Sequence, residues 1–356
     1  MKHDFPTVAT RRMGFILVPN FSMIAFTSAI EPFRLANYAT GQDLYSWTLY
    51  SPDGAPVTGS NGVTVSVDAA AAAARDLDAV FVCGGNSIQS YDHRETIAAL
   101  RRLSSFGTAV GALCTGAYVL AKAGLLEGYR STIHWVYHAG LVNAFPELEV
   151  SQEIFEIDRN RYTCAGGMGA ADLALSLVAR EQGMNVAAQV TDLLIHDRQR
   201  EAGERQRMAL RARTGIAHPR LLAALDLMEK NIEEPLSVDA LAAAAGLSHR
   251  QLERLFAKYC RASPTRHYMR VRLQRARELL RQTTMPILSI GLACGFGSAS
   301  YFSKSYLDHF GHPPSAERKR DQLSTMALDA PRPRRGRGAV ASAPSESSHA
   351  SSRVEP

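Results

Sequence analysis

Hydrophobic and polar residues follow two different patterns along the 356 residues of the chain, and the change between them separates two regions. In the first region, which ends near residue 197, uninterrupted apolar runs lie between longer mixed segments. Clear examples are Met13 to Val18, Asp78 to Cys83 and Thr108 to Leu113. Such runs are typical of strands that are buried on both faces of a parallel sheet. In the second region apolar residues recur at helical spacing among many charges, which predicts an α/β domain followed by an all-α domain.

Further elements are predicted between the apolar runs of the first region. The expected helices are Ser22 to Asn37, Ala117 to Ala123 and about Ala170 to Glu181. The expected shorter strands are Trp47 to Ser51, Val63 to Val67 and Arg161 to Cys164. This alternation predicts a layered domain with a mostly parallel sheet, in which binding sites gather beyond the carboxyl ends of the strands.

The second region contains one pattern twice, and the copies are about 49 residues apart. Each copy has a short apolar helix, a turn at a glycine (Gly246 or Gly295) and then an amphipathic helix. In the first copy Ser248 and Gln251 have the spacing of a capping box, which marks the start of the new helix. The pattern therefore predicts two helix-turn-helix motifs.

A single helix is predicted between the two motifs, starting at Ser263-Pro264, where serine caps and proline occupies the first turn. About 18 residues at ~1.5 Å each give a rod of ~27 Å. Such a rod can hold two recognition helices near the ~34 Å repeat of a DNA duplex, so that one chain enters two successive major grooves.

Residues 236–319 resemble the DNA-binding domain of the AraC/XylS family of transcription regulators, on the stretches ALAAAAGLSHRQLERLF, RLQRARELL and LSIGLACGFGSASYFSKSY. The resemblance implies double-stranded DNA at a promoter or operator as the partner. It places the base-reading positions at His249, Arg250, Glu253 and Arg254 in the first recognition helix and at Ala299, Ser300, Ser303 and Lys304 in the second. Arginine suits guanine edges, and small side chains suit thymine methyl groups or a close approach.

The uneven distribution of charge along the chain is consistent with a DNA-binding second region. Residues 1–197 hold 13 Lys and Arg against 19 Asp and Glu, whereas residues 198–320 hold 22 against 11. An acidic domain followed by a basic one is expected of a sensor joined to a polyanion binder. We therefore expect a ligand-sensing domain at 1–197, a charged linker at 198–216 that is part helical and part flexible, and a DNA-binding domain at 217–320. The Pro/Ser/Gly-rich residues 321–356 are expected to be a disordered tail.

Cys114 is the sharpest chemical feature of the first region. It lies where a predicted strand turns sharply into a helix, which is the geometry of a nucleophile elbow. A thiol at a helix N-terminus is expected to have a lowered pKa. Asp172 follows Gly166-Gly167 and is expected to match the charge of the helix that starts there.

The first region resembles the DJ-1/PfpI-like superfamily over about residues 10–190, on the stretches FVCGG, GALCTGAYVLAKAGLL and STIHWVYH. Joined to an AraC-type domain, it looks like the GlxA-type regulators, which implies a flavodoxin-like layered sheet and a small-molecule effector. The candidate ligand-binding residues are Gly84, Gly85, Cys114, Thr115, His134 and Trp135. Enzymatic relatives commonly have a histidine after the cysteine, whereas this chain has a threonine. Cys114 can thus line a pocket, pack in the core, or act in catalysis or redox sensing.

The same resemblance implies an effector of the amino-acid or quaternary-amine class, such as glycine betaine, carnitine or arginine. The aromatic residues Phe21, Tyr118, Trp135 and Tyr137 lie near the candidate loops and suit a cation held against aromatic faces.

The favoured function is a ligand-responsive activator of a catabolic operon that binds DNA, works with RNA polymerase and can form a homodimer. The alternative is a cysteine-dependent hydratase or amidase-like enzyme, or a redox sensor, that uses Cys114 and carries a DNA-binding module. We expect a regulator rather than an enzyme, with no cofactor and no metal. Five scattered cysteines without a C-x-x-C pair suit a reduced cytoplasmic setting, and no apolar run is long enough to indicate a membrane span.

Overall fold

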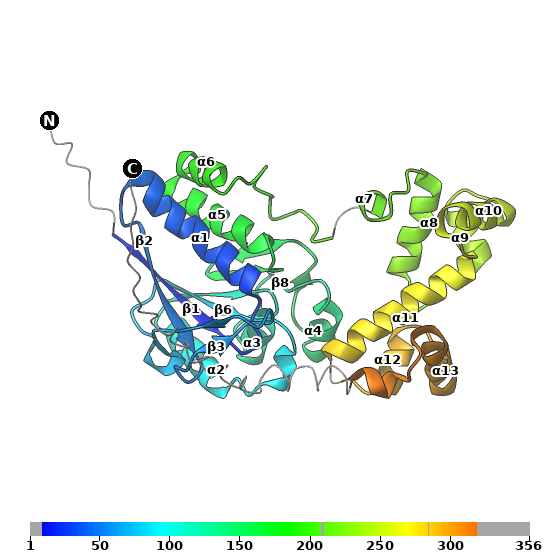
Figure 1. The fold of residues 1–356 in the computed structure, drawn as a ribbon, viewed down its shortest axis with the longest axis horizontal. Helices are drawn as coiled ribbons and strands as arrows, with labels where there is room; N and C mark the ends of the chain where they lie inside the picture. Colours follow the sequence, from blue (N-terminus) through cyan, green and yellow to red (C-terminus); the bar gives the residue numbers. More distant parts are fainter. Residues whose placement is uncertain (1–8, 208–209, 284, 319–356) are drawn as a thin grey trace, which may run out of the picture.

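The computed structural model describes residues 9–207, 210–283 and 285–318, arranged as two lobes (Figure 1). The first lobe contains the sheet with its helices, and the second contains the helices that follow residue 210. The tail predicted at residues 321–356 lies outside the described residues.

A mixed sheet of seven strands forms the centre of the first lobe, in the order β10-β11-β7-β6-β1-β2-β5. Its strands are β1 (Arg11–Leu17), β2 (Tyr45–Ser51), β5 (Ala69–Ala70), β6 (Ala79–Cys83), β7 (Ala109–Leu113), β10 (Phe155–Asp158) and β11 (Arg161–Cys164). All neighbouring pairs are parallel except β10 with β11. The prediction of an α/β domain with a mostly parallel sheet is therefore confirmed.

Helices cover both faces of this sheet, because the side chains of a strand alternate between the two sides. In β1, Met13, Phe15 and Leu17 pack on one side with α1 (Met23–Thr40), α5 (Gly169–Gln182) and α6 (Met184–Leu193). Ile16 packs on the other side with α2 (Arg94–Ser105), α3 (Ala117–Lys122) and α4 (His138–Ala144). We did not predict α2, α4, α6 or β10 from the sequence. The shorter elements are β3 (Val57–Thr58), β4 (Thr64–Val65), η1 (Ala71–Ala73), η2 (Ile88–Ser90), β8 (Ser131–Thr132) and β9 (Val150–Ser151).

The first half of the connector between the lobes forms specific contacts with the first lobe. Arg200 forms an ion pair with the fully buried Asp172, at 2.7 Å between Nη2 and Oδ2. The Gln206 side-chain amide donates to Thr132 Oγ1 and to the carbonyl of Ile133, each at 2.9 Å. Residues 198–207 thus bind along the first lobe, and Asp172 anchors the connector. Only α7 (Leu210–Thr214), which follows, is helical.

The second lobe repeats one unit of structure, as the sequence predicted. It consists of α8 (Pro219–Lys230), α9 (Val238–Ala244), α10 (His249–Cys260), α11 (Pro264–Gln282), α12 (Ile287–Ala293) and α13 (Ala299–Phe310). Exposed and buried positions follow the same order along α10 and α13, so both helices bury one stripe and present the same face. The turns contain Gly246 at φ +65° and Gly295 at φ +74°, a conformation that favours glycine. The capping box at Ser248 and Gln251 is present.

An arginine from the preceding helix locks each of these turns. Arg220 on α8 donates to the carbonyl of Gly246 at 2.8 Å. Arg272 on α11 donates to the carbonyl of Cys294 at 2.8 Å, and its guanidinium lies 4.3 Å from the centre of the Phe296 ring. These bonds satisfy carbonyls that a helix end leaves without an intrahelical partner.

A buried carboxylate joins the end of the described chain to the second motif. Glu317 is 1% exposed and accepts hydrogen bonds from Arg277 at 3.1 Å, Arg281 at 2.6 Å and the Tyr306 hydroxyl at 3.0 Å. Burial, the largest influence, raises the pKa of Glu317, but these hydrogen bonds outweigh it and leave the pKa lowered. Helices α11 and α13 are therefore held together through one ionised side chain.

The two lobes touch at α4 and the C-terminal end of α11, which lie beside each other in Figure 1. Gly140 on α4 is buried, and a Cβ at this position would lie 2.8 Å from Thr283 Cγ2. Ala139 packs against the apolar core of the second motif. A glycine at 140 thus allows the close approach of the two helices.

We predict that Glu317→Gln lowers the free energy of unfolding of the helical domain by about 1–3 kcal/mol, because the buried Tyr306 hydroxyl and two arginines lose their charged acceptor. The lowered pKa means that this stabilisation is present above the ordinary glutamate pKa and is lost as the pH falls through the folded value. Urea unfolding of both proteins at pH 7 and in acid measures it. The exposed Glu234, changed to Gln, is the control. Equal losses in the two variants, or a difference that grows in acid, would contradict the role of Glu317.

Candidate nucleic-acid interface and ligand pocket

The first recognition helix, α10, presents its predicted base-reading side chains to solvent. His249, Arg250 and Arg254 are exposed and Glu253 is half-buried. His249 Nδ1 lies 2.6 Å from Asp239 Oδ1 on α9, and this hydrogen bond raises the pKa of His249. The two helices of the motif are thereby linked at the exposed surface.

The second recognition helix, α13, presents a different chemistry on the equivalent face. Ala299, Ser300 and Lys304 are exposed, and Ser303 is half-buried. Ser298 caps the helix by accepting the amide of Tyr301 at 3.3 Å. The first helix therefore offers charged and hydrogen-bonding groups, whereas the second offers mainly small side chains and one lysine.

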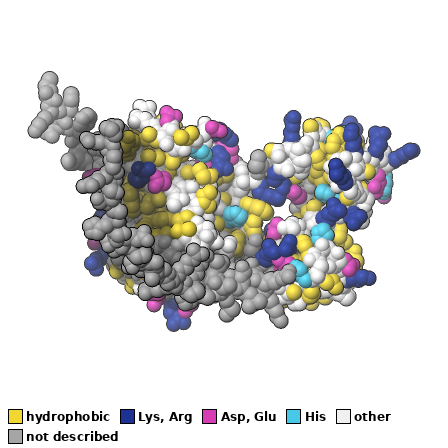
Figure 2. All heavy atoms as spheres, in the orientation of Figure 1, with side chains coloured by type: hydrophobic (Ala, Val, Ile, Leu, Met, Phe, Trp, Pro, Cys, Tyr) yellow, Lys and Arg dark blue, Asp and Glu magenta, His cyan; other side chains and the backbone are white. Residues whose placement is uncertain are grey.

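Basic side chains project from the helical lobe around these helices, as Figure 2 shows. Several of them are exposed and form no ion pair within the described parts of the chain: Arg250, Arg254, Lys258, Arg261, Arg266 and Arg270. Cations without an internal ion pair are available to phosphate groups, and their contacts with DNA weaken as salt rises.

In the first lobe the predicted elbow is present at the end of β7. Cys114 has φ +60°, which is uncommon for a residue other than glycine. A Cβ at Gly116 would lie 2.2 Å from the carbonyl oxygen of Val82, so the chain can turn here only with glycine. The adjacent Thr115 is fully buried, and its hydroxyl donates to the carbonyl of Gly85 at 2.7 Å.

Close packing also occupies the two glycines that were candidate ligand residues. A Cβ on Gly84 would lie 2.4 Å from the amide nitrogen of Gly116, and one on Gly85 would lie 1.9 Å from the carbonyl oxygen of Asn20. Together with Thr115 they join neighbouring strand ends. Gly84, Gly85 and Thr115 thus have packing roles in this structure.

The predicted lowering of the Cys114 pKa is wrong. Burial raises the pKa of the Cys114 thiol to about 12, and Cys164 on the neighbouring strand adds to the effect. Cys83, Cys114 and Cys164 are all buried, free thiols at adjacent strand ends. The following helix, α3, has only six residues, so its dipole is weak against the loss of water around the sulfur.

His134 and Trp135 lie directly beyond the elbow. The amide of His134 donates to the carbonyl of Cys114 at 3.3 Å. Its ring stacks on Trp135 with 5.8 Å between centroids, and Nδ1 accepts the amide of Val136 at 3.4 Å. Burial lowers the pKa of His134, which favours the neutral ring. Through these contacts Cys114, His134 and Trp135 form one group of candidate ligand residues, separate from the hydrogen bond between Thr115 and Gly85.

The four aromatic residues expected near the pocket do not gather at one place. Phe21 is fully buried, with its ring 5.9 Å from that of Phe26. Tyr118 packs on Phe145, with 5.8 Å between ring centroids. Tyr137 stays beside His134, at 6.4 Å. Of the four aromatic residues expected to hold a cation, only Trp135 and Tyr137 therefore lie near each other, both beside His134.

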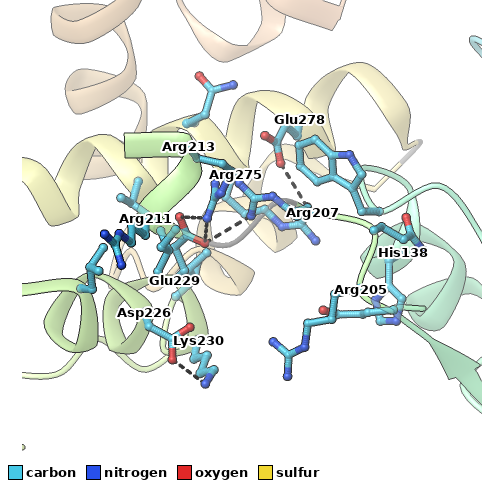
Figure 3. Close-up of a pocket in the computed structure, with 18 of the residues that line it drawn as sticks. His138, Arg205, Arg207, Arg211, Arg213, Asp226, Glu229, Lys230, Arg275 and Glu278 are labelled. Atoms are coloured by element: carbon cyan, nitrogen blue, oxygen red, sulfur yellow. Dashed lines mark hydrogen bonds and ion pairs between the residues drawn. The ribbon is translucent and has the colours of Figure 1, made fainter. Parts of the chain in front are cut away.

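A cavity of about 1000 Å³ opens between the two lobes beside Trp135. Its walls come from the first lobe, from the connector and from α8 and α11, and Figure 3 shows its basic residues Arg205, Arg207, Arg211, Arg213 and Arg275. Sequence reasoning missed this cavity because its charged residues look like an ordinary solvated connector. The one available signal was the density of arginines in residues 198–213.

Within the described residues, no group of three or more His, Cys, Asp or Glu side chains is placed to hold a metal ion. Among the same residues, no helix has the length and apolar character needed to cross a membrane.

Comparison with known proteins identifies both lobes. Residues 241–320 match the family model described as a helix-turn-helix domain, and residues 12–180 match that of the DJ-1/PfpI family. The chain is 42% identical over 321 residues to the HTH-type transcriptional regulator GbdR of Pseudomonas aeruginosa, covering 90% of this chain and 88% of that protein. It is 40% identical to CdhR of the same species over 317 residues (89% and 94% covered). It is 37% identical to GlxA of Rhizobium meliloti over 311 residues (87% and 96% covered).

We predict that Cys114 reacts slowly with iodoacetamide at pH 8, because a thiol with a pKa of about 12 forms very little thiolate. Cys260, which is only partly buried, is the internal control and is expected to be modified first. Peptide mass spectrometry over time gives both rates. Faster modification of Cys114 than of Cys260 would show that the thiol is activated after all.

Proposed function

The chain belongs to the family of HTH-type transcriptional regulators in which a DJ-1/PfpI domain precedes an AraC-type helix-turn-helix domain, and on this premise we propose a ligand-responsive activator of a catabolic operon. One observation carries the proposal: α10 and α13 present matching exposed faces on two motifs that share α11. A pair of recognition helices joined by one rod of ~28 Å suits two successive major grooves.

In this proposal the two helices divide the work of recognition. Arg250 and Arg254 donate to guanine edges, while His249 and Glu253 contact neighbouring bases. On the second helix, Ala299, Ser300 and Ser303 allow close approach to the bases, and Lys304 contacts an edge or a phosphate. The exposed arginines around the helices supply affinity that does not depend on sequence.

We propose a sensing domain over residues 1–197, a connector over 198–216 and a DNA-binding domain over 217–320. An activator of this kind contacts RNA polymerase and binds paired half-sites, for which a homodimer is suited. Effector binding shifts the arrangement of the domains and so the placement of the recognition helices. These functions belong in the cytoplasm, where the DNA is.

We propose that the effector is an amino acid or a quaternary amine that binds near Cys114, His134 and Trp135. Cys114 supports His134 through its backbone carbonyl and turns over no substrate. Two observations argue against catalysis: burial raises the pKa of the thiol, and burial also lowers the pKa of His134, whose Nδ1 already accepts a backbone amide. The alternative, a hydratase, amidase or redox sensor that uses Cys114, would need a thiol that ionises near neutral pH.

We predict that Arg254→Ala relaxes base preference at one operator position by about 1–3 kcal/mol, because a bidentate contact to a base edge is lost. Operators are first mapped across the genome, and binding is then measured on libraries randomised at each position. Lys258→Ala, on the same helix, is the control and is expected to weaken all sequences alike. A uniform loss for Arg254→Ala would assign that arginine to a phosphate. If the full chain prefers no duplex, the DNA-binding assignment itself fails.

We predict heat on mixing the full chain with at least one of glycine betaine, carnitine and arginine in a calorimeter. Trp135→Leu should abolish that heat, because the variant loses the aromatic face. Tyr38→Leu, at an exposed tyrosine on α1, is the control and should leave the heat unchanged. No heat from any of the three compounds would remove the proposed effector class.

A further inference from the structure

An arginine of the chain itself covers the face of Trp135. The Arg207 guanidinium carbon lies 4.5 Å from the centre of the Trp135 ring, within the range of a cation–π contact. Arg207 Nη1 also lies 3.3 Å from Oε2 of Glu229 on α8. An aromatic face together with a carboxylate is the chemistry that recognises an organic cation, and here a guanidinium fills that place.

The backbone before Arg207 is fixed to the sensing domain. The amide of Ile154 donates to the carbonyl of Glu204 at 2.9 Å, and that of Gln206 donates to the carbonyl of Gln152 at 3.3 Å. The Gln206 side chain is bound to Thr132 and Ile133. Arg207 is therefore the first connector residue beyond a rigid attachment, and its side chain reaches from the sensing domain to α8.

Glu229 holds a second connector residue as well. Arg213 Nη2 lies 2.9 Å from Glu229 Oε2, so this carboxylate keeps a partner if Arg207 leaves. Figure 3 shows Arg207, Arg213 and Glu229 together at the wall of the cavity. Glu229 thus remains paired with Arg213 when Arg207 leaves Trp135, so no carboxylate is left without a partner. Exchange of Arg207 for another cation is therefore feasible.

The rest of the cavity suits an anion. Seven basic side chains line it against three acidic ones: Arg205, Arg207, Arg211, Arg213, Lys230, Arg270 and Arg275 against Asp226, Glu229 and Glu278. Within the described residues, Arg205, Arg211 and Arg270 form no ion pair. Guanidinium groups of this kind bind a carboxylate through paired hydrogen bonds.

We propose that the cavity between the domains is the effector site, that it takes a zwitterion with an organic cation and a carboxylate, and that Arg207 occupies the cation position as an internal competitor. The ligand cation displaces Arg207 from Trp135, while its carboxylate binds the unpaired arginines. Displacement breaks the Arg207–Glu229 pair, a direct link between the connector's rigid segment and α8, and so changes how the domains are held. This inference rests on the proposed regulator function and specifies where and how its effector acts.

The protein offers an internal optical probe for this exchange, because Trp47 and Trp135 are its only tryptophans. In the full chain carrying Trp47→Phe, emission reports on Trp135 alone. Glycine betaine is the zwitterionic probe, tetramethylammonium supplies only the cation and acetate supplies only the anion. We expect both cationic probes to change the emission, with the zwitterion binding more tightly, and acetate to leave it unchanged.

Substitutions then test separately the competition by Arg207 at the cation position and the binding of the ligand carboxylate by Arg205. If Arg207 covers Trp135 about nine-tenths of the time, Arg207→Ala binds both cationic probes about tenfold more tightly. Arg159→Ala is the matched control, because Arg159 lies 3.7 Å from the Tyr129 ring, away from the cavity, and its loss should leave probe affinity unchanged. Arg205→Gln is expected to weaken glycine betaine several-fold without affecting tetramethylammonium.

Operator binding without any probe completes the test. Arg207→Ala alone should bind operator DNA as the probe-saturated parent does. If Arg207→Ala binds the cationic probes no more tightly than the parent does, Arg207 is not a competitor. The same conclusion follows if Arg159→Ala binds them as tightly as Arg207→Ala. Absence of binding by every probe in every variant overturns the cation site, whereas operator binding in the same samples still tests the regulator assignment separately.

Discussion

The helical domain depends on the apolar stripe of one helix, α11. Leu273, Ala276 and Leu280 of this stripe are buried in the core of the second motif, while Tyr268 near its start belongs to the core of the first. One rigid element therefore contributes to two separate cores. The distance between the recognition helices is set by the length of that element rather than by a flexible loop, and the arginines of α11 secure the turn and the last described residues of the second motif.

Much of this arrangement could be predicted from the sequence, because local chemistry specifies it. Apolar runs such as Met13 to Val18 specify buried strands, and Ser248 with Gln251 specifies the start of α10 by hydrogen bonds within one turn. The paired motifs could be found because the same local rules occur twice. By contrast, α2 was not predicted, although its buried positions from Thr96 to Leu103 recur at helical spacing and so could have been recognised.

What the sequence could not provide are quantities that depend on distant parts of the chain. The position of Cys114 at an elbow is local, but its pKa depends on burial by neighbouring strands, and burial outweighs the short helix beside it. The connector illustrates the same limit. Its charges suggest a solvated linker, yet Asp172 and Thr132, 28 and 74 residues earlier in the chain, hold it in place. The sequence therefore predicted a site at the strand ends, whereas the cavity in the structure lies between the two lobes, where the connector is held.

The close approach of Gly140 to Thr283 has a consequence for how the protein responds in the cell. Helix α4 begins three residues after Trp135, and it touches the end of the helix that sets the spacing of the DNA-binding motifs. A free-energy coupling between two binding sites is reciprocal, so whatever an effector does to operator affinity, the operator does to effector affinity by the same factor. If the proposed effector acts through this contact, protein bound to operators and protein free in solution have different effector affinities, so the number of operators in a genome shifts the effector concentration at which the protein responds.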